Sequence, residues 1–216
     1  MGFFDILTKP EETMKALVSK ANLNDALKTF AIYGAIIGII IGAILWTIGF
    51  AAAWIIGTIP GVNTGGLAVF VASLASLGVL AIIICAILGV ILSVIGSAIM
   101  YGIIWLCAKL LGGTGTFTQN YYLASKLVWP SLVAGLIAYI VGSILMIVFI
   151  GFLIILAFEL YMIFVIVVLV SVANKISKLR ALAAVLLPII VVGIIAIIIA
   201  IIVALAVSSA GPTVVY

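Results

Sequence analysis

Long apolar runs alternate with short polar blocks along this chain. The runs cover residues 31–59, 67–107, 127–158 and 181–207, and none of them contains a charged residue. Each run exceeds the roughly 18 apolar residues that indicate a membrane-crossing helix. The pattern therefore predicts helices inside a bilayer.

The stretch from residue 67 to residue 111 has an ambiguous length. As a single helix its 45 residues extend for about 67 Å at helical rise. That length is too great for one crossing and barely enough for two crossings with a very tight turn. Hydropathy alone leaves both alternatives open.

The positions of the basic residues decide between these alternatives. One crossing by residues 67–111 and two by residues 127–173 leave all nine basic residues on the side of the N-terminus. If residues 67–111 and 127–173 each crossed twice, five of them would lie across the membrane. If residues 67–111 crossed twice and residues 127–173 once, two of them would. Basic loops stay on the cytoplasmic side, so the first arrangement is favoured. The residues concerned are Lys9, Lys15, Lys20, Lys28, Lys109, Lys126, Lys175, Lys178 and Arg180.

The sequence therefore predicts an all-α, polytopic membrane bundle with the N-terminus inside and the C-terminus outside. Residues 1–26 form a cytoplasmic amphipathic lead, residues 27–207 the five-helix membrane domain, and residues 208–216 a short extracytoplasmic tail. A separate short helix is expected at residues 67–77, either in the outer interface or folded back into the bundle. The five spans are expected at residues 27–56, 79–111, 127–150, 152–173 and 182–207.

Capping patterns predict where the polar blocks begin new helices. Thr8 and Glu11 have the spacing of a capping box, with Pro10 in the first turn. An amphipathic surface helix should follow, led by apolar side chains that enter the interface. Asn22 should cap the helix that continues into the first span. The residues expected to enter the interface are Phe3, Phe4, Ile6 and Leu7.

The polar block after the second span has similar signals. Residues 112–115 read Gly-Gly-Thr-Gly and should end the second span. Thr116 and Gln119 form a second capping box that opens the next helix. Pro130 should kink or restart that helix, and Pro188 should bend the fifth span, as membrane helices tolerate.

Composition narrows the function classes. Hydrophobic residues make up 69% of the chain and charged residues 6%, against about 25% charged in a soluble domain. The net charge is +4, but the sequence does not predict a basic face with interleaved aromatic residues of the kind that binds nucleic acid. This charge is better suited to the anionic headgroups of the inner leaflet. Bilayer lipids are the expected partners, with a second copy or another membrane protein as further possibilities, and nucleic acid is excluded.

The sequence lacks the components of most catalytic sites. It has no histidine, which excludes Ser-His and Cys-His nucleophiles and HExxH zinc sites. Intramembrane aspartyl catalysis needs two acids in the membrane, and Glu159 stands alone there. Cys85 and Cys107 have no partners at metal-ligand spacing. We therefore expect no enzyme, no metal and no cofactor.

Glu159 is the one ionisable residue expected deep in a span. An ionisable residue inside a membrane suggests a functional role by default, here that of a proton or cation relay. A protonated side chain hydrogen-bonded to a neighbouring helix is the alternative. No span offers a basic partner, so the hydrogen-bonded form is favoured.

Small residues recur at helical spacing in the first two spans. Gly34, Gly38 and Gly42 lie on one face of the first span, where another backbone can approach closely. The series of Gly89, Ser93 and Ser97 forms a similar face on the second. Packing within the bundle is the favoured interpretation, and homodimerisation is the alternative.

The block around residues 106–117, Leu-Cys-Ala-Lys-Leu-Leu-Gly-Gly-Thr-Gly-Thr-Phe, resembles the hallmark of the Yip1-domain family. In that pattern a span ends in the glycines, and a helix then leads to a proline, here Pro130. The basic turn at Lys178 and Arg180 is also similar to the family's turn before its last span. The residues of this chain that match the pattern are Gly112, Gly113, Gly115, Phe117, Pro130 and Arg180.

The resemblance implies five spans, a cytosolic N-terminus and a C-terminus across the membrane. Eukaryotic members of that family are adaptors of ER–Golgi traffic that associate with Rab GTPases and with one another. They carry a long acidic N-terminal region, whereas about 26 residues precede the first expected span here. The short lead and the abundance of isoleucine predict a prokaryotic member, archaeal or bacterial, in the cell membrane.

Three functions are compatible with these features. The favoured hypothesis is a non-enzymatic, membrane-organising adaptor that acts through helix packing and a basic cytoplasmic face. A transporter or channel that uses Glu159 is the first alternative, and a hydrated cavity at Glu159 would favour it. A lipid-handling protein is the second, and a lateral groove open to the bilayer would favour that.

Overall fold

The computed structural model describes residues 2–58 and 78–209, and within these ranges it is built of helices. The short helix expected at residues 67–77 lies outside them. The elements are α1 (Asp5–Thr8), α2 (Pro10–Val18), α3 (Leu23–Thr58), α5 (Val79–Leu110), α6 (Phe117–Ile144), the 3₁₀ helix η1 (Leu145–Val148), α7 (Ile150–Asn174) and α8 (Lys178–Ser209). The expectation of an all-α membrane protein is thereby confirmed.

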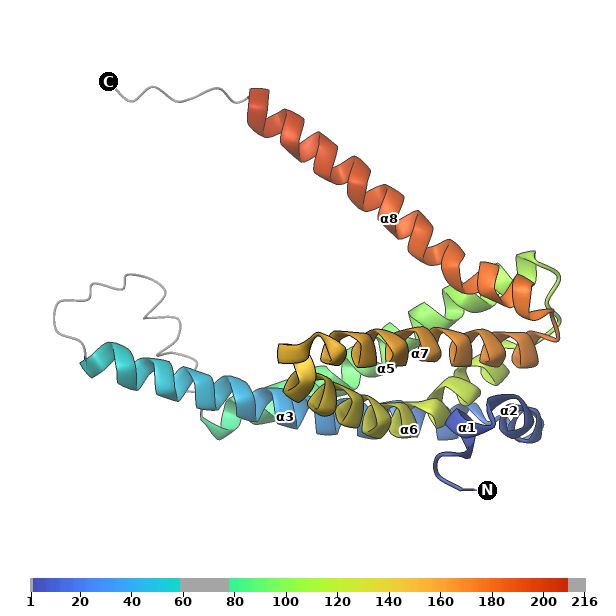
Figure 1. Cartoon of the computed structure of the whole chain (residues 1–216), viewed down its shortest axis with the longest axis horizontal. Helices are drawn as coiled ribbons and strands as arrows, with labels where there is room; N and C mark the ends of the chain where they lie inside the picture. The colour runs from blue at the N-terminus through green and yellow to red at the C-terminus, as the bar shows by residue number, and fades with distance from the viewer. Residues whose placement is uncertain (1, 59–77, 210–216) are drawn as a thin grey trace.

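Four helices run side by side in alternating directions (Figure 1). Helix α3 packs chiefly on α5, and α6 packs chiefly on α7. Helix α8 contacts α5 and α7 near its start and then diverges from the other helices. Its early residues Ala181 and Ala184 are fully buried, whereas Ile189 and Ile190 are about 60% exposed, at 62% and 58%.

The helices expose apolar side chains over most of their length. Within the described residues, four helices are long and apolar enough to cross a bilayer, over Leu23–Ala51, Val79–Leu110, Phe117–Ile144 and Ile150–Asn174. Large apolar side chains that face outward along a helix require an apolar surrounding. The chain is therefore a multi-pass integral membrane protein.

The buried core is concentrated where α1 and α2 pack against the long helices. It includes Met14 of α2, Ile104 of α5, Leu123 of α6 and Leu169 of α7. The halves of α3 and α5 farther from this core are largely exposed. Packing among protein side chains is thus strongest at one end of the bundle.

Two of the predicted helix starts are confirmed. Thr116 Oγ1 accepts a hydrogen bond from the backbone N–H of Gln119 at 3.2 Å. Gln119 Oε1 accepts one from the backbone N–H of Thr116 at 2.9 Å. Asn22 Oδ1 accepts from the amide of Asn24 at 2.9 Å. Helix α3 then continues unbroken into the first predicted span.

The predictions for the first ten residues are partly wrong. Thr8 does not cap α2, because it is the last residue of α1 and its hydroxyl donates to the carbonyl of Phe4 at 3.2 Å. Lys9 occupies the N-cap position without a side-chain cap. Ile6 and Leu7 are 3% and 7% exposed and belong to the core, whereas Phe3 and Phe4 do face outward. The turn of helix at α1 directs Ile6 and Leu7 against the bundle.

Pro130 does not restart a helix. Helix α6 runs through it from Phe117 to Ile144, and helix α8 likewise runs through Pro188. A proline has no backbone N–H group, so one helical hydrogen bond is missing at each of these positions. Helices in a membrane bundle tolerate this loss because neighbouring groups satisfy the freed carbonyl.

The lead is held against the turn between α7 and α8 by an ion-pair bridge. Glu11 on α2 lies 2.8 Å from Lys15 Nζ and 2.7 Å from Lys178 Nζ. The hydroxyl of Tyr161 on α7 also donates to the carbonyl of Leu7. Hydrogen bonds from Lys15 and Lys178 lower the pKa of Glu11 from 4.5 to about 2.

Replacing Glu11 with Gln should loosen the lead in a pH-dependent manner. Because the folded-state pKa is depressed, the bridge stabilises the docked lead above the ordinary pKa and is lost as the pH falls toward 2. Hydrogen–deuterium exchange of residues 5–18 should be faster in E11Q than in wild type at neutral pH. The two proteins should converge near pH 2, and E12Q should behave as wild type throughout. Equal exchange in E11Q and wild type at pH 7 contradicts the bridge.

Candidate functional site

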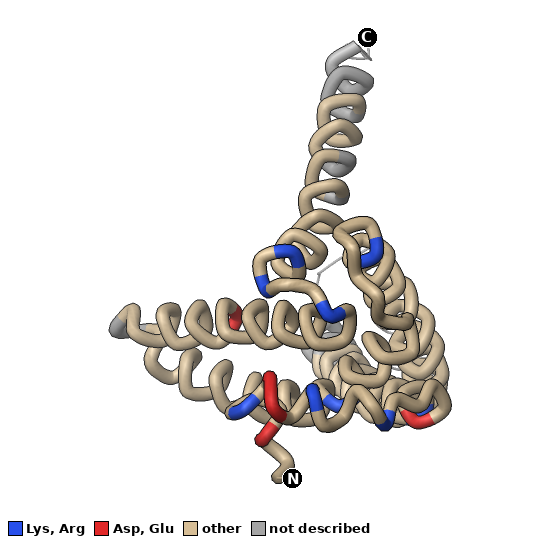
Figure 2. Tube along the Cα trace, turned by 90° about the vertical axis from the view of Figure 1, so that its right-hand side faces the viewer, with Lys and Arg blue, Asp and Glu red and all other residues tan. Residues whose placement is uncertain are grey.

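The basic residues gather around one end of the bundle (Figure 2). The α2–α3, α5–α6 and α7–α8 connections lie at this end, which we call the basic end. The α6–α7 connection at the opposite end, residues 145–149, carries no charge. The described part of the chain is therefore strongly asymmetric in charge along the bundle axis.

The glycine-rich connector between α5 and α6 packs directly on the end of α7. A Cβ atom on Gly115 would lie 2.0 Å from the carbonyl oxygen of Ala173, and one on Gly113 would lie 3.0 Å from Cβ of Asn174. The Thr114 amide donates to the Asn174 carbonyl at 2.9 Å. Gly112 has a φ of +89°, a conformation that glycine adopts readily. The three glycines thus let the connector turn and touch α7.

Aromatic side chains fix the other side of the connector. The indole nitrogen of Trp105 donates to the Gly115 carbonyl at 3.1 Å. Phe117 stacks on Tyr121, with ring centroids 5.3 Å apart. The hydroxyl of Tyr121 lies 3.0 Å from Ser97 Oγ on α5. Phe117 therefore joins the connector to the interface between α5 and α6.

A reciprocal amide pair lies beneath the connector. Asn120 on α6 and Asn174 on α7 are 1% and 0% exposed. Asn174 Nδ2 donates to Asn120 Oδ1 at 2.8 Å, and Asn120 Nδ2 donates to Asn174 Oδ1 at 3.2 Å. Each amide also donates to a carbonyl of its own helix. The pair satisfies the buried amides and fixes the register of α6 against α7.

Arg180 and the neighbouring lysines form an exposed basic surface beside the connector. Lys175, Lys178 and Arg180 are all exposed. A Cβ atom on Gly112 would lie 3.6 Å from Nη1 of Arg180, so the guanidinium lies next to the connector. Lys175 directly follows the last residue of α7 and has a φ of +56°. The structure thus brings the glycine connector and the basic turn of α7 and α8 together.

Glu159 lies away from this surface, within α7. The hydroxyl of Tyr139 on α6 donates a hydrogen bond to Glu159 Oε1. Both side chains are exposed on the surface of the helix pair. The arrangement is one hydrogen-bonded pair between neighbouring helices. Pro130, the other motif residue, is buried in α6 and lies outside the basic surface.

The glycine face of α3 lies against α5. Cβ atoms on Gly34 and Gly38 would lie 2.3 Å and 2.2 Å from the carbonyl oxygens of Gly89 and Cys85. A Cβ on Gly42 would lie 2.8 Å from Cα of Ile82. Small residues therefore allow the two backbones to touch along this seam, as in other membrane helix pairs.

A cysteine at Gly42 should form a disulfide with Cys85. Its Cβ would lie 3.1 Å from Cβ of Cys85, and a small displacement brings that distance into the roughly 3.5–4.5 Å range of disulfides. Copper phenanthroline should therefore oxidise G42C in a Cys107→Ala background to an intramolecular disulfide, detected as a linked peptide by mass spectrometry. The matched variant G193C, with nothing within 4 Å of its Cβ, should not pair with Cys85. An intermolecular disulfide in G42C would instead assign the seam to contacts between copies.

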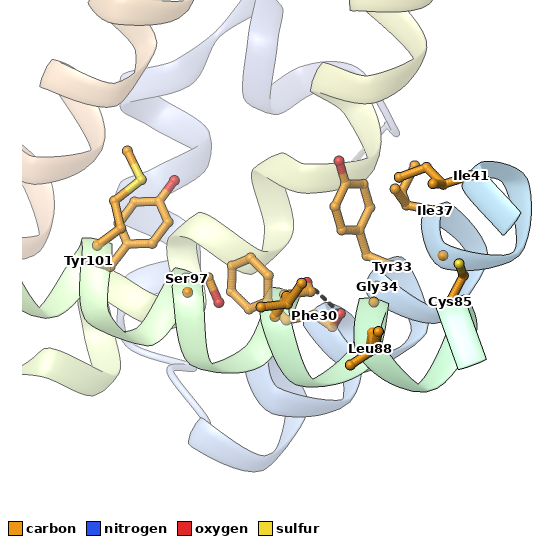
Figure 3. Close-up of a pocket in the computed structure, with 15 residues that line it drawn as sticks. Phe30, Tyr33, Gly34, Ile37, Ile41, Cys85, Leu88, Ser97 and Tyr101 are labelled. Carbon is orange, nitrogen blue, oxygen red and sulfur yellow. Dashed lines mark hydrogen bonds between the residues drawn. The ribbon is translucent and has the colours of Figure 1, made fainter. Parts of the chain in front are cut away.

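The same two helices form a lateral groove. Its volume is about 580 Å³, and all of its described lining comes from α3 and α5. Figure 3 shows Tyr33 and Ile37 of α3 and Tyr101 and Leu88 of α5 along it. Among the described residues, no cluster of three or more His, Cys, Asp or Glu side chains is placed to hold a metal ion.

Sequence reasoning missed Asn120, which lies in the polar block after the second expected span, and Asn174, which directly follows the fourth. It also missed a second close approach, at the end opposite the basic end. There a Cβ on Gly151 would lie 1.9 Å from the carbonyl oxygen of Gly142. Isolated residues of this kind form no repeating pattern, so nothing in the sequence marked them as contacts.

Comparison with known proteins gives one match over almost the whole chain. The family model described as Yip1 domain matches residues 4–201. No curated protein and no solved structure matches the chain.

Proposed function

Because this chain belongs to the Yip1 domain family, we propose that it is a non-enzymatic membrane adaptor that recruits partners through its basic end. The observation that carries this proposal is the assembly of the exposed Lys175, Lys178 and Arg180 beside the glycine connector. The connector is hydrogen-bonded to the end of α7 and to Trp105, so the basic surface rests on a packed support. Rigid support is what a recognition surface requires.

The proposed topology has five crossings with the basic end in the cytoplasm. The alternation of α3, α5, α6 and α7 supports it, because these helices bring the polar connections to the same end. Helix α8, with 32 residues from Lys178 to Ser209, is the proposed fifth crossing. The basic residues then face the anionic headgroups of the inner leaflet, which attract them.

The hydrogen bond from Tyr139 to Glu159 supports an adaptor over a relay. A relay passes a proton or ion along several polar groups from different helices. Glu159 is instead bonded to one tyrosine of the adjacent helix, and the groove is lined elsewhere, by α3 and α5. The carboxyl group then serves to join α6 to α7.

An affinity purification from mild detergent tests the adaptor proposal. Changing Lys175, Lys178 and Arg180 together to Gln should remove specific partners that wild type retains. The charge-preserving variant K175R/K178R/R180K should keep them. E11Q breaks the ion pair to Lys178 without removing basic charge, so it should keep them too. Equal recovery of partners by wild type and the Gln variant, or no specific partner with either, contradicts the proposal.

A further inference from the structure

We propose that the groove between α3 and α5 binds one acyl chain of a phospholipid from the leaflet at the basic end. This site is separate from the basic surface and does not depend on the adaptor function. Three features of the groove point to this ligand: its floor, its length and its polarity.

The floor of the groove is made of glycines. Gly34, Gly38 and Gly89 lie where the backbones of α3 and α5 are in contact. Larger side chains such as Ile37, Ile41 and Leu92 line the groove on either side of this seam (Figure 3 labels the two isoleucines). Because the glycines have no side chains, the larger side chains beside them enclose a narrow apolar channel along the helix pair. Its volume of about 580 Å³ lies in the usual range of roughly 300–1,000 Å³ for small-molecule sites.

Along α3, the length of the groove is close to that of one leaflet. It extends over residues 30–41 of α3, which is about 16 Å at helical rise. On α5 it extends over residues 85–101, or about 24 Å. Half of the hydrocarbon core measures about 15 Å. The groove therefore accommodates a chain that enters near the interface and ends near the bilayer centre.

The polarity of the groove orients such a chain. Tyr33, Ser97 and Tyr101 bring hydroxyl groups to the half nearer the basic end, whereas Ile41, Cys85 and Leu88 line the other half. Tyr101 lies about 14 Å from the end of α5 at helical rise. Lys28 and Lys109 lie on the same two helices, nearer the basic end. A headgroup at the basic end and a chain along the glycine seam match this gradient.

The gradient also favours a lipid over a second copy of the chain. A helix with its side chains is about 10–12 Å across, which is wide for a channel whose floor is a line of backbone contact. The described helices of this chain present continuous apolar faces, which do not match a groove with hydroxyl groups at one end. A lipid tail is thin and amphiphilic overall, as the groove requires.

Photolabelling tests this site in the intact protein. The protein is reconstituted in phosphatidylcholine vesicles with a trace of phosphatidylglycerol that carries a diazirine on its acyl chain. After irradiation, adducts are located by mass spectrometry. We expect about tenfold more label on Ile41, Leu88 and Leu92 than on Ile197 and Ile198, the equally lipid-facing residues of α8. Excess unlabelled phosphatidylglycerol should suppress the groove adducts selectively.

Gly96 offers a way to fill the groove without disturbing the fold. It lines the groove, and a Cβ there would meet no other atom within 4 Å. G96F should lower labelling of Ile41 and Leu88 by about tenfold. The matched variant G193F, which also projects into open space but on α8, should leave that labelling unchanged.

Two results overturn the proposal. One is labelling of Ile41, Leu88 and Leu92 that equals the labelling of α8 and is not suppressed by unlabelled lipid. The other is unchanged labelling of Ile41 and Leu88 in a folded G96F variant. The suppression by unlabelled lipid is measured on wild type, so the test stands even if G96F does not fold.

Discussion

Replacing Gly115 with alanine is expected to lower the free energy of unfolding by about 3 kcal/mol, the upper part of the usual range for overpacking. The added Cβ would lie 2.0 Å from the carbonyl oxygen of Ala173 and 2.8 Å from Cα of Asn174. Both are backbone atoms, so no side chain can rotate away to relieve the contact. The connector must move off the end of α7, which also weakens the Trp105 bond to the Gly115 carbonyl.

Reversible unfolding in mixed detergent micelles measures this effect. Gly96→Ala is the matched control, because its Cβ meets open space and alanine in a helix interior is favoured over glycine by about 1 kcal/mol. G96A should thus be at least as stable as wild type. Equal stability of G115A and G96A contradicts the close packing of the connector on α7.

Replacing Asn174 with alanine should cost about 2 kcal/mol of unfolding free energy, because it leaves the buried Asn120 amide without its partner. Replacing Asn120 should have a similar effect for the same reason. The double variant should cost less than the sum of the two, since nothing is left unpaired. We expect a coupling energy of about 1 kcal/mol, as for hydrogen-bonded pairs between membrane helices.

Ser125 supplies the control for this cycle. It is as buried as the asparagines, at 0% exposed, but its hydroxyl bonds to the Tyr122 carbonyl of its own helix at 2.7 Å. Ser125→Ala should therefore have a smaller effect and no coupling to Asn120. Additive effects of the two asparagine substitutions contradict a register-fixing role for the amide pair.

The long helices followed from the sequence because membrane crossing depends on simple, local properties. Helix α5 begins at Val79 and ends at Leu110, within one residue of the expectation. The Thr116 capping box was predictable for the same reason, since its two hydrogen bonds join residues three apart. Such signals do not depend on the rest of the fold.

The errors arose where distant contacts decide the local structure. Thr8 and Glu11 have the spacing of a capping box, yet Glu11 pairs with Lys178, far along the chain. Ile6 and Leu7 resemble interfacial residues in sequence, yet they lie in the core. The short lead contacts α6 and α7, and no pattern within it shows which of its faces they cover.

The candidate site was predictable as a motif and not as a geometry. The sequence singled out Gly112, Gly113, Gly115 and Arg180, but it could not show that the connector packs on Ala173. The glycine seam of α3 was expected as a packing face. The groove beside it depends on the register of α3 against α5, which places Gly34 opposite Gly89. Register between helices is a tertiary property, and one sequence does not specify it.

Site-specific labelling of the two membrane faces tests the topology on which the proposed cytoplasmic role of the basic end depends. Single cysteines replace Thr114, in the connector, or Thr213, near the C-terminus, in a chain whose Cys85 and Cys107 are changed to Ala. Intact cells are treated with a membrane-impermeant maleimide before and after permeabilisation. We predict that position 213 is labelled in intact cells and position 114 only after permeabilisation. Labelling of both positions under the same condition contradicts five crossings with a cytoplasmic basic end.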